Sequence, residues 1–334
     1  MPVDFTQWVD EFRENFCDSP KRAIMQALWC SYLGLWFTVT SRFTFGQKIY
    51  ERDWDALILL DACRSDALRE VAPEYDFLDQ SEIESVWSVG SGSLEFMCKN
   101  FTYEYEDQIN ETVYTAANGF LNRAFVEHEY APSVAIPFGW PRYNVVRADD
   151  FKELTNVWDS RYSEQLKNVP PWEMTDAAIS AGRRNPDASR YIFHFTQPHI
   201  PHISEAVEEE RSVTEKEADP WKYIRRGDLS YEVAYERYLD NLRIVLDNVE
   251  TLLENLDVDT AVISADHGEA FGDWRINGHP TAFPHPNVKK VPWIEVTAED
   301  RNTRQPEPIP EEVNNCKSIS ESTVQQQLED LGYI

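Results

Sequence analysis

Four short, continuously apolar runs constrain the fold of this chain more than any other feature. They span residues 56–61 (ALILLD), 190–195 (RYIFHF), 260–264 (TAVIS) and 291–296 (VPWIEV), and residues 133–136 are a shorter candidate. Runs of this kind are typical of parallel strands buried on both faces. Between them lie helical patterns, the strongest over residues 230–256. The alternation predicts an α/β fold with a large, mostly parallel central sheet sandwiched between helices.

With 334 residues, the chain can form one large α/β domain. We expect an N-terminal helical segment at residues 1–50 and a central domain at 51–298. Residues 299–334 are expected to form a surface tail with a short C-terminal helix. The polar, acid-rich stretch 204–228 is interpreted as a loop or lid over one edge of the site.

The charge excludes one class of partner. Asp and Glu number 59 against 31 Lys and Arg, which gives a formal net charge of −28. Phosphate backbones require a basic face, so nucleic acid is not an expected partner. Arg outnumbers Lys by 21 to 10. An acidic, Lys-poor surface stays hydrated in concentrated salt, and we therefore favour a halophilic source over an acidic protein adapted to ordinary salt.

The cysteines and the N-terminus bear on location. The five cysteines are an odd number without a CxxC pair, which favours reduced thiols and a cytoplasmic protein. Residues 1–18 are polar and acidic and do not resemble a signal peptide. The apolar stretch 23–39 is at the lower limit for a membrane span. A buried or surface-docking helix is the favoured interpretation, and peripheral membrane contact remains open.

Six of the seven histidines fall in two short windows, which favours a metal or catalytic site. Asp266 and His267 follow the apolar run 260–264 directly, so both are expected at the carboxyl end of a strand, where ligands bind in such sheets. A carboxylate beside an imidazole suits Zn or Mn, and carboxylates alone suit Mg or Ca. His279 either completes the metal shell or contacts substrate, with an ordinary loop histidine as the alternative.

Two more segments carry candidate residues. Asp61 ends a buried strand, where an unpaired carboxylate is costly and a cation is its natural partner. Arg64 either steadies an anionic substrate or forms a salt bridge with Asp61 or Asp66. In the segment GSGS, glycines flank Ser91 just before an expected helix start, and a hydroxyl there can be a nucleophile supported by the helix N-terminus. The alternative is that Ser91 or Ser93 only caps the helix.

Together these segments resemble the alkaline phosphatase superfamily, and in particular its sulfatase-like branch. The resemblance lies in the order of Asp61, Ser91 and the late ADHGE segment with Asp266 and His267. The segment HFTQPHIPHI is similar to a sulfatase motif in which His199 would bind substrate, and SGSLEF resembles the nucleophile segment of lipoteichoic-acid-synthase-type phosphotransferases. The chain departs from sulfatases in lacking a formylglycine motif and in having Ala62 and Gln197 where they have Asp.

The resemblance implies a metal-dependent ester hydrolase. Its metal would be bound by Asp61, Asp266, His267 and the Ser91 oxygen, with one divalent ion (Ca, Mg, Mn or Zn) expected and a second left open. Ser91 would attack phosphorus while His199 and Arg64 stabilise the transferring group, and His199 or His279 would protonate the leaving oxygen. The expected substrate is an anionic phosphate ester, either a small molecule or one linked to glycan or lipid. The alternatives are a sulfate ester hydrolase and a non-catalytic binding protein of the same fold.

Overall fold

The computed structural model describes residues 5–130, 136–139 and 141–306. The strands are β1 (Ala56–Leu60), β2 (Glu84–Trp87), β3 (Thr112–Ala116), β4 (Glu153–Asn156), β5 (Arg190–Phe195), β6 (Ala261–Ser264), β7 (Ala270–Phe271), β8 (Asn277–Gly278) and β9 (Lys290–Val296). The helices are α1 (Phe5–Asp18), α2 (Pro20–Thr40), α3 (Ser65–Val71), α4 (Ser93–Asn100), α5 (Glu106–Ile109), α6 (Leu121–Phe125), α7 (Trp158–Arg161), α8 (Pro171–Arg184), α9 (Ser204–Glu208), α10 (Glu215–Ala218), α11 (Pro220–Arg226), α12 (Tyr231–Leu253) and α13 (Pro286–Lys289).

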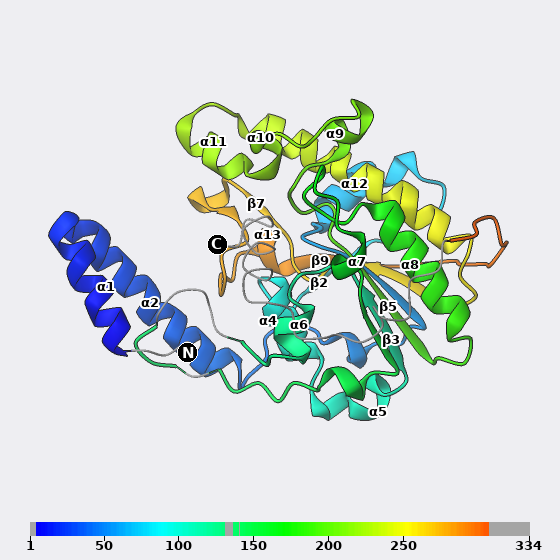
Figure 1. Cartoon of the computed structure of the whole chain (residues 1–334), viewed down its shortest axis with the longest axis horizontal. Coiled ribbons are helices and arrows are strands. Elements are labelled where there is room, and N and C mark those ends of the chain that lie inside the picture. Colours follow the sequence, from blue (N-terminus) through cyan, green and yellow to red (C-terminus); the bar gives the residue numbers. More distant parts are fainter. Residues whose placement is uncertain (1–4, 131–135, 140, 307–334) are drawn as a thin grey trace.

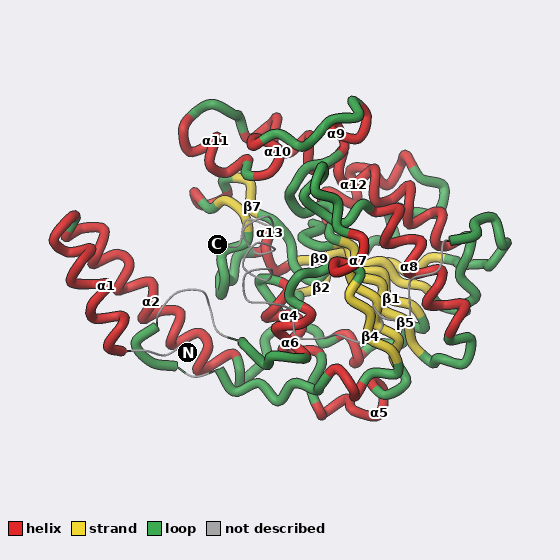
Figure 2. The backbone as a smooth tube through the Cα atoms, viewed as in Figure 1, coloured by secondary structure: helices red, strands yellow, loops and turns green. Residues whose placement is uncertain are grey.

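A seven-stranded sheet with the order β2-β9-β6-β1-β5-β3-β4 forms the centre of the molecule (Figures 1 and 2). β1 pairs in parallel with both β5 and β6, and β3 pairs in parallel with both β4 and β5. The predicted fold class is therefore confirmed. β9 differs from the expected parallel strand, because it runs antiparallel to both β6 and β2. The connection from β6 to β9 contains β7, β8 and the short helix α13, and lacks the longer helix that usually forms a parallel crossover.

Each face of the sheet carries its own apolar core, because successive side chains of a strand point to opposite faces. Ile58 and Leu60 face a core that includes residues of α3, α8 and α12. Leu57 and Leu59 face a second core that includes residues of α4 and α6. Figure 1 shows these helix groups on opposite sides of the sheet. Burial on both faces explains why β1 is apolar at every position.

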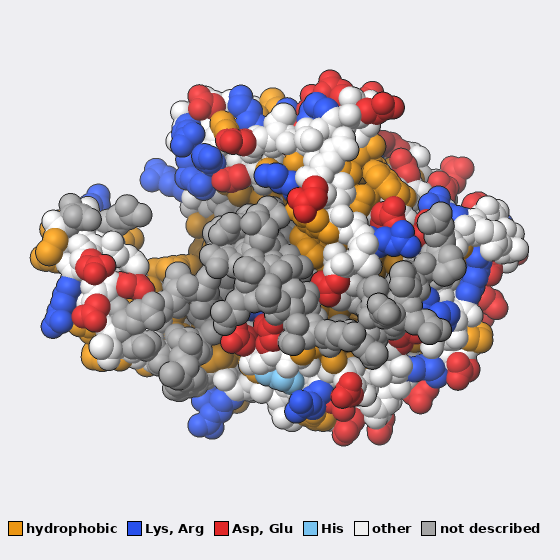
Figure 3. Space-filling view, in the orientation of Figure 1, with side chains coloured by type: hydrophobic (Ala, Val, Ile, Leu, Met, Phe, Trp, Pro, Cys, Tyr) orange, Lys and Arg blue, Asp and Glu red, His pale blue; other side chains and the backbone are white. Residues whose placement is uncertain are grey.

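The helices α1 and α2 form an antiparallel pair that projects from the sheet domain (Figure 1). One side of α2 is buried in a small apolar cluster of Cys30, Leu33 and Phe37 with Ile136 and Ala282. Several apolar side chains of α2 are exposed instead, namely Ile24, Met25, Leu28, Trp29, Leu35 and Val39. Figure 3 shows hydrophobic side chains, in orange, on the surface of the α1–α2 pair. The stretch Ala23–Thr40 has a mean hydropathy of 1.2 and is long and apolar enough to cross a membrane. Core helices of other proteins also meet this criterion, but only 33% of this stretch is buried.

The structure contains strands that the apolar runs do not reveal. β2, β3 and β4 include Ser, Thr, Tyr, Asn and Glu side chains, so none of them reads as a continuous apolar run. Most of the polar stretch 204–228 is folded into the short helices α9, α10 and α11. The candidate strand 133–136 falls almost wholly outside the described residues, and the predicted C-terminal helix lies entirely outside them.

Candidate metal centre and active site

The carboxyl ends of three neighbouring strands meet at a buried group of acidic and imidazole side chains. Asp61 directly follows β1, His194 belongs to β5, and Asp266 lies two residues beyond β6. Because β1 pairs with β5 on one side and β6 on the other, these side chains converge at one edge of the sheet. A ligand atom from each of the three lies within 4.8 Å of the others, and all three residues are buried. Such a group fits a metal ion.

His267 belongs to the same group. Its Nε2 atom lies 3.2 Å from Asp61 Oδ1 and 3.6 Å from Asp266 Oδ2. Its Nδ1 atom lies 2.9 Å from the carbonyl oxygen of Gly268, which can only accept a hydrogen bond. Nδ1 of His267 therefore carries a proton and Nε2 faces the two carboxylates, so in the neutral ring Nε2 is the atom that offers a lone pair to a metal ion. This is the tautomer that a metal ligand requires.

The charges in this group are unbalanced without a cation. Asp61 Oδ1 and Asp266 Oδ2 are buried and accept no hydrogen bond from the described residues. Burial would lower the pKa of His267, but Asp266 and Asp61 outweigh it and raise that pKa to about 10. Burial would raise the pKa of Asp266, but His267 and His194 hold it well below its usual value. Two buried carboxylates with free oxygen atoms are what a divalent cation stabilises.

The backbone around the centre is shaped to hold it. Ala62 adopts a φ of 64°, in the left-handed region that side chains rarely enter, and its N–H donates to Asp266 Oδ1 over 3.3 Å. Strained backbone of this kind persists where the surroundings over-determine it. A Cβ atom on Gly268 would lie 2.2 Å from the carbonyl oxygen of Asn287, so the turn after His267 needs glycine.

Ser93, rather than Ser91, lies at the metal centre. The Ser93 Oγ atom is 3.4 Å from Asp61 Oδ2 and 3.5 Å from His267 Nε2. Ser93 is the first residue of α4, and Gly92 precedes it as the N-cap. The Ser91 hydroxyl instead donates to Glu95 over 2.7 Å and accepts from the N–H of Ala282 over 2.8 Å. The expected placement of the Ser91 oxygen in the metal shell therefore gains no support from the geometry.

Glu95 holds the turn that leads to Ser93. Its buried carboxylate accepts hydrogen bonds from the N–H and hydroxyl of Ser91, from Trp36 Nε1 of α2 and from Lys99 Nζ. Burial alone would raise the pKa of Glu95, but Lys99 and Lys289 lower it to about 2. The charged carboxylate thus links the turn before α4 to an N-terminal helix.

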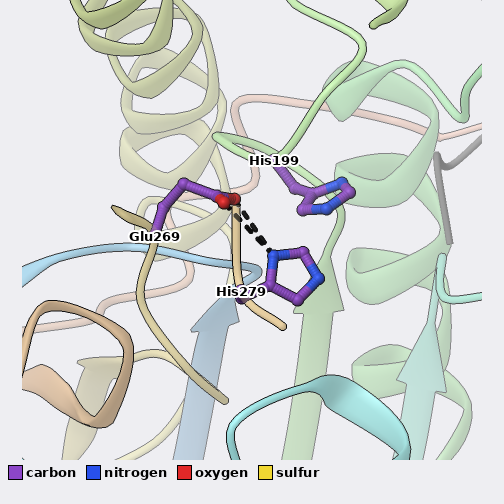
Figure 4. Close-up of side chains that lie close together, drawn as sticks. All are labelled: His199, Glu269 and His279. Atoms are coloured by element: carbon purple, nitrogen blue, oxygen red, sulfur yellow. Dashed lines mark hydrogen bonds and ion pairs between the residues drawn. The ribbon is translucent and has the colours of Figure 1, made fainter. Parts of the chain in front are cut away.

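A second group of possible ligands consists of His199, Glu269 and His279, whose donor atoms also lie within 4.8 Å of one another. Figure 4 shows the Glu269 carboxylate pointing toward both rings. His279 Nδ1 lies 3.2 Å from Glu269 Oε2, and the His279 and His267 rings are 4.2 Å apart. β7 and β8 explain the pairing. Ala270 opposes Gly278 in this antiparallel pair, Glu269 directly precedes β7, and His279 directly follows β8, so the two residues meet at the same end.

Burial dominates the pKa values in this second group. It raises the pKa of Glu269 to about 7 and lowers that of His279 to about 3. It also lowers the pKa of His199, whose Nδ1 lies 2.7 Å from the carbonyl oxygen of Ile200. Neutral imidazoles are metal ligands as well as proton carriers, so the group suits either role.

Arg64 is held by Asp66 and by the backbone of Glu269. Its Nε donates to Asp66 over 2.9 Å, its Nη2 forms an ion pair with the same carboxylate, and its Nη1 donates to the carbonyl oxygen of Glu269 over 3.3 Å. This is the salt bridge to Asp66 that the sequence left open. The expected contact of Arg64 with a transferring group stays a prediction.

Sequence reasoning did not identify several residues of the site. Asn118 follows β3 and donates to Asp61 Oδ2 over 3.0 Å. His194 was grouped with other histidines but was not identified as a ligand, although it stands at the end of an apolar run next to the strand of Asp61. The position of Asn118 after TVYTA was hidden because that strand is not recognisable as an apolar run.

Comparisons with known proteins find structural likeness only. No protein-family profile matches the sequence, and no curated protein matches it. The chain matches the soluble domain of lipooligosaccharide phosphoethanolamine transferase A from Neisseria meningitidis at 13% identity and a TM-score of 0.42, covering 77% of this chain and 80% of that one. The match to the integral membrane form is at 12% identity and a TM-score of 0.46, covering 88% of this chain and 59% of that one.

A solved structure of another kind also matches. It is a putative sulfatase from Bacteroides thetaiotaomicron, at 13% identity and a TM-score of 0.39, covering 75% of this chain and 66% of that one. The structural match to phosphoethanolamine transferases and sulfatases is therefore real but distant. It concerns the course of the chain, and the chemistry has to be assigned from the residues of the site.

Proposed function

We propose that this chain is a metal-dependent hydrolase or phosphotransferase that cleaves phosphate esters, with Ser93 as its nucleophile. The observation that carries the proposal is the position of the Ser93 hydroxyl, which lies within 3.5 Å of Asp61 and His267 at the first residue of a helix. Free N–H groups and the helix dipole favour anions at that end of a helix. A hydroxyl, a cation site and an anion-binding helix terminus thus coincide.

Asp61, Asp266 and His267 would hold a divalent metal ion, with Ser93 Oγ close enough to complete the shell. The mixed carboxylate and imidazole ligands favour Zn or Mn. When bound, such an ion lowers the pKa of a serine hydroxyl and neutralises negative charge on a phosphoryl group. Asn118 and the backbone N–H of Ala62 orient the two carboxylates through their second oxygen atoms.

The residues of the chain account for both halves of the reaction. Ser93 Oγ attacks phosphorus, the bond from phosphorus to the leaving oxygen breaks, and Asp61 Oδ2 is placed to accept the serine proton. Glu269, whose pKa burial raises to about 7, is placed to pass a proton to Nδ1 of His279 while the His279 ring gives the proton on its other nitrogen to the leaving oxygen. Water or an acceptor alcohol then gives its proton to the Glu269–His279 pair and attacks phosphorus. The bond from phosphorus to Ser93 Oγ breaks, and Asp61 returns its proton to Oγ as phosphate or a new ester is released.

The proposal is tested by a panel of aryl phosphate, phosphodiester and sulfate esters, assayed with Zn or Mn at high salt. Turnover of phosphate esters, together with a phosphoryl adduct located on Ser93 by mass spectrometry of acid-quenched enzyme, is the expected result. Preferential turnover of sulfate esters would identify a sulfatase with the same site. Bound metal without turnover of any ester would favour a non-catalytic binding protein. A cytoplasmic location and an anionic ester substrate, small or linked to glycan or lipid, remain parts of this proposal.

A further inference from the structure

A cavity of about 890 Å³ lies apart from the metal centre, between the C-terminal part of α2, strand β2 and helix α13. Its walls are largely aromatic or apolar and include Trp36, Phe45, Trp87 and Pro284, and two lysines, Lys99 and Lys289, also line it. The volume is within the range of sites that bind small molecules. Phe45 and Trp87 are exposed at 64% and 44%, whereas both lysines are buried. The aromatic residues therefore form the mouth of the cavity, and the lysines form its base.

The Lys289 ammonium group is the unusual feature of this cavity. The side chain is only 3% exposed, yet no carboxylate of the described residues lies within ion-pair distance of it. Lys99 is different, because its Nζ contacts Glu95 at 2.7 Å. Burial lowers the pKa of Lys289 to about 8, against the attraction of Glu95. A buried charge without a close partner is costly, so an anion entering the cavity would be stabilised there.

The surroundings of the mouth indicate what kind of molecule carries that anion. Leu35, Val39 and Phe43 are exposed apolar side chains on α2 and directly after it, and they lead toward Phe45. Exposed apolar side chains that follow one another closely in this way are typical of an interaction site. It offers a place for hydrocarbon beside a cavity with a cationic base. Glu51 also lines the cavity, but it is exposed, so its charge is screened by solvent.

We propose that this cavity binds the anionic headgroup of a membrane lipid, with Lys289 contacting the headgroup and the acyl chains lying along the exposed face of α2. The site is separate from the proposed active site, because the Glu95 side chain stands between Lys99 and the turn that carries Ser91. It holds whether or not the chain cleaves phosphate esters. The helix pair would then bring the sheet domain to a lipid surface.

The test is co-sedimentation of the full chain with vesicles of phosphatidylcholine alone and with vesicles that also contain phosphatidylglycerol. The net charge of −28 opposes approach to an anionic surface, so the assay is run at about 1 M KCl, where the screening length is about 3 Å. We expect roughly fivefold tighter binding to the anionic vesicles, the effect of one lysine near a lipid surface. Lys289→Met should abolish that preference, and Phe45→Ala, at an exposed position, should weaken binding without affecting folding.

Lys222→Met is the matched control, because Lys222 is a lysine of α11 remote from the cavity lining, and it should keep the preference. Equal binding of Lys289→Met and the unaltered chain to anionic vesicles would overturn the proposal, as would equal binding to both kinds of vesicle or to neither. The last experiment adds soluble glycerol 3-phosphate as a competitor of vesicle binding. If it competes at the same concentration as vesicle lipid, the cavity recognises a free phosphate ester and the lipid assignment is wrong.

Discussion

The Oγ atom of Ser93 lies 3.5 Å from Nε2 of His267, although 174 positions separate the two residues in the sequence. Ser93 reaches this position from the first turn of α4, and His267 from the loop that follows β6. Their meeting point also receives Asp61 and Asp266, the residues we assign to the metal. This relationship decides which of the neighbouring serines is the better candidate for chemistry.

Replacing the two serines separately should give opposite results. Ser93→Ala should lower phosphate ester turnover by roughly three orders of magnitude or more, because the covalent route is lost. Ser91→Ala should retain turnover but lose about 1–3 kcal/mol of stability, because buried groups of Glu95 and Ala282 lose a partner. Steady-state kinetics and thermal melts measure both. An adduct on Ser91, or normal turnover by Ser93→Ala, would contradict the assignment.

Removing a carboxylate from the metal centre should remove the metal. We expect Asp266→Asn and Asp61→Asn to lose bound metal and activity together, because each supplies a buried oxygen atom without a donor. Asp240→Asn, at an exposed position of α12, is the control and should keep both. Elemental analysis of the purified variants gives the metal content. Normal metal content in both site variants would show that the ion binds elsewhere.

The role of His199, Glu269 and His279 in proton transfer can be tested with substrates that differ in the basicity of the leaving group. If His279 protonates the leaving oxygen, Glu269→Gln should slow alkyl phosphates far more than nitrophenyl phosphates, whose leaving groups need no proton. Metal content should stay at that of the unaltered chain. Loss of one metal ion per chain in Glu269→Gln would instead identify this group as a second metal site.

Acid should weaken the ion pair between Glu217 and Arg211, which lies in the segment that contains α9, α10 and α11. Glu217 is buried and accepts from Nη1 and Nη2 of Arg211 over 2.8 and 2.7 Å. Burial would raise the pKa of Glu217, but Arg211 and Thr214 lower it to about 2. A carboxyl group whose pKa is lowered by folding stabilises the fold at pH values above its pKa in the unfolded chain, which is about 4.3. That contribution is lost as the pH falls toward 2.

The unaltered chain should therefore be more stable than Glu217→Gln at pH 6, and the difference should shrink as the pH falls from about 5 to 2. Denaturant unfolding at a series of pH values measures it. A difference that stays constant over this range would mean that the Arg211 ion pair does not set the stability of the segment.

Salt should stabilise the fold. With a net charge of −28, the folded chain repels itself, and screening shortens the reach of that repulsion from about 10 Å at 0.1 M salt to about 3 Å at 1 M. The melting temperature should rise across this range of KCl. A midpoint that is flat or falls with added salt would remove the support for a halophilic source.

The sequence was sufficient to predict the buried strands at the centre of the sheet and the polar residues at their carboxyl ends, because those features are written in local patterns. Buried parallel strands such as β1 and β6 have to be apolar throughout, and Asp61, Asp266 and His267 stand where these strands stop. The antiparallel direction of β9 was not predictable in this way, because its apolar side chains report burial and carry no information on strand direction. β3 was missed for a related reason, since its Thr and Tyr side chains do not form an apolar run, and Asn118 was missed with it.

The choice between Ser91 and Ser93 shows a different limit. The glycines on both sides of Ser91 made it look like the residue presented at a turn. In the structure one of them, Gly90, approaches Phe96 so closely that a Cβ atom would lie 2.5 Å from the Phe96 nitrogen. Gly90 is therefore needed for the turn to pack closely on α4, and the Ser91 hydroxyl donates its hydrogen bond to Glu95. Which serine faces the metal depends on where α4 begins, and a shift of one or two residues is beyond what local patterns resolve.

The hydrogen bond from Trp36 to Glu95 has a consequence for the N-terminal helices. Trp36 lies on α2, and Glu95 fixes the turn from which Ser93 emerges. A movement of α2 would therefore pull on the turn before Ser93 through the Trp36 indole. If α2 docks on a lipid surface and Ser93 is the nucleophile, as we propose, that contact would reach the turn before Ser93 through Glu95, and docking would be connected to turnover.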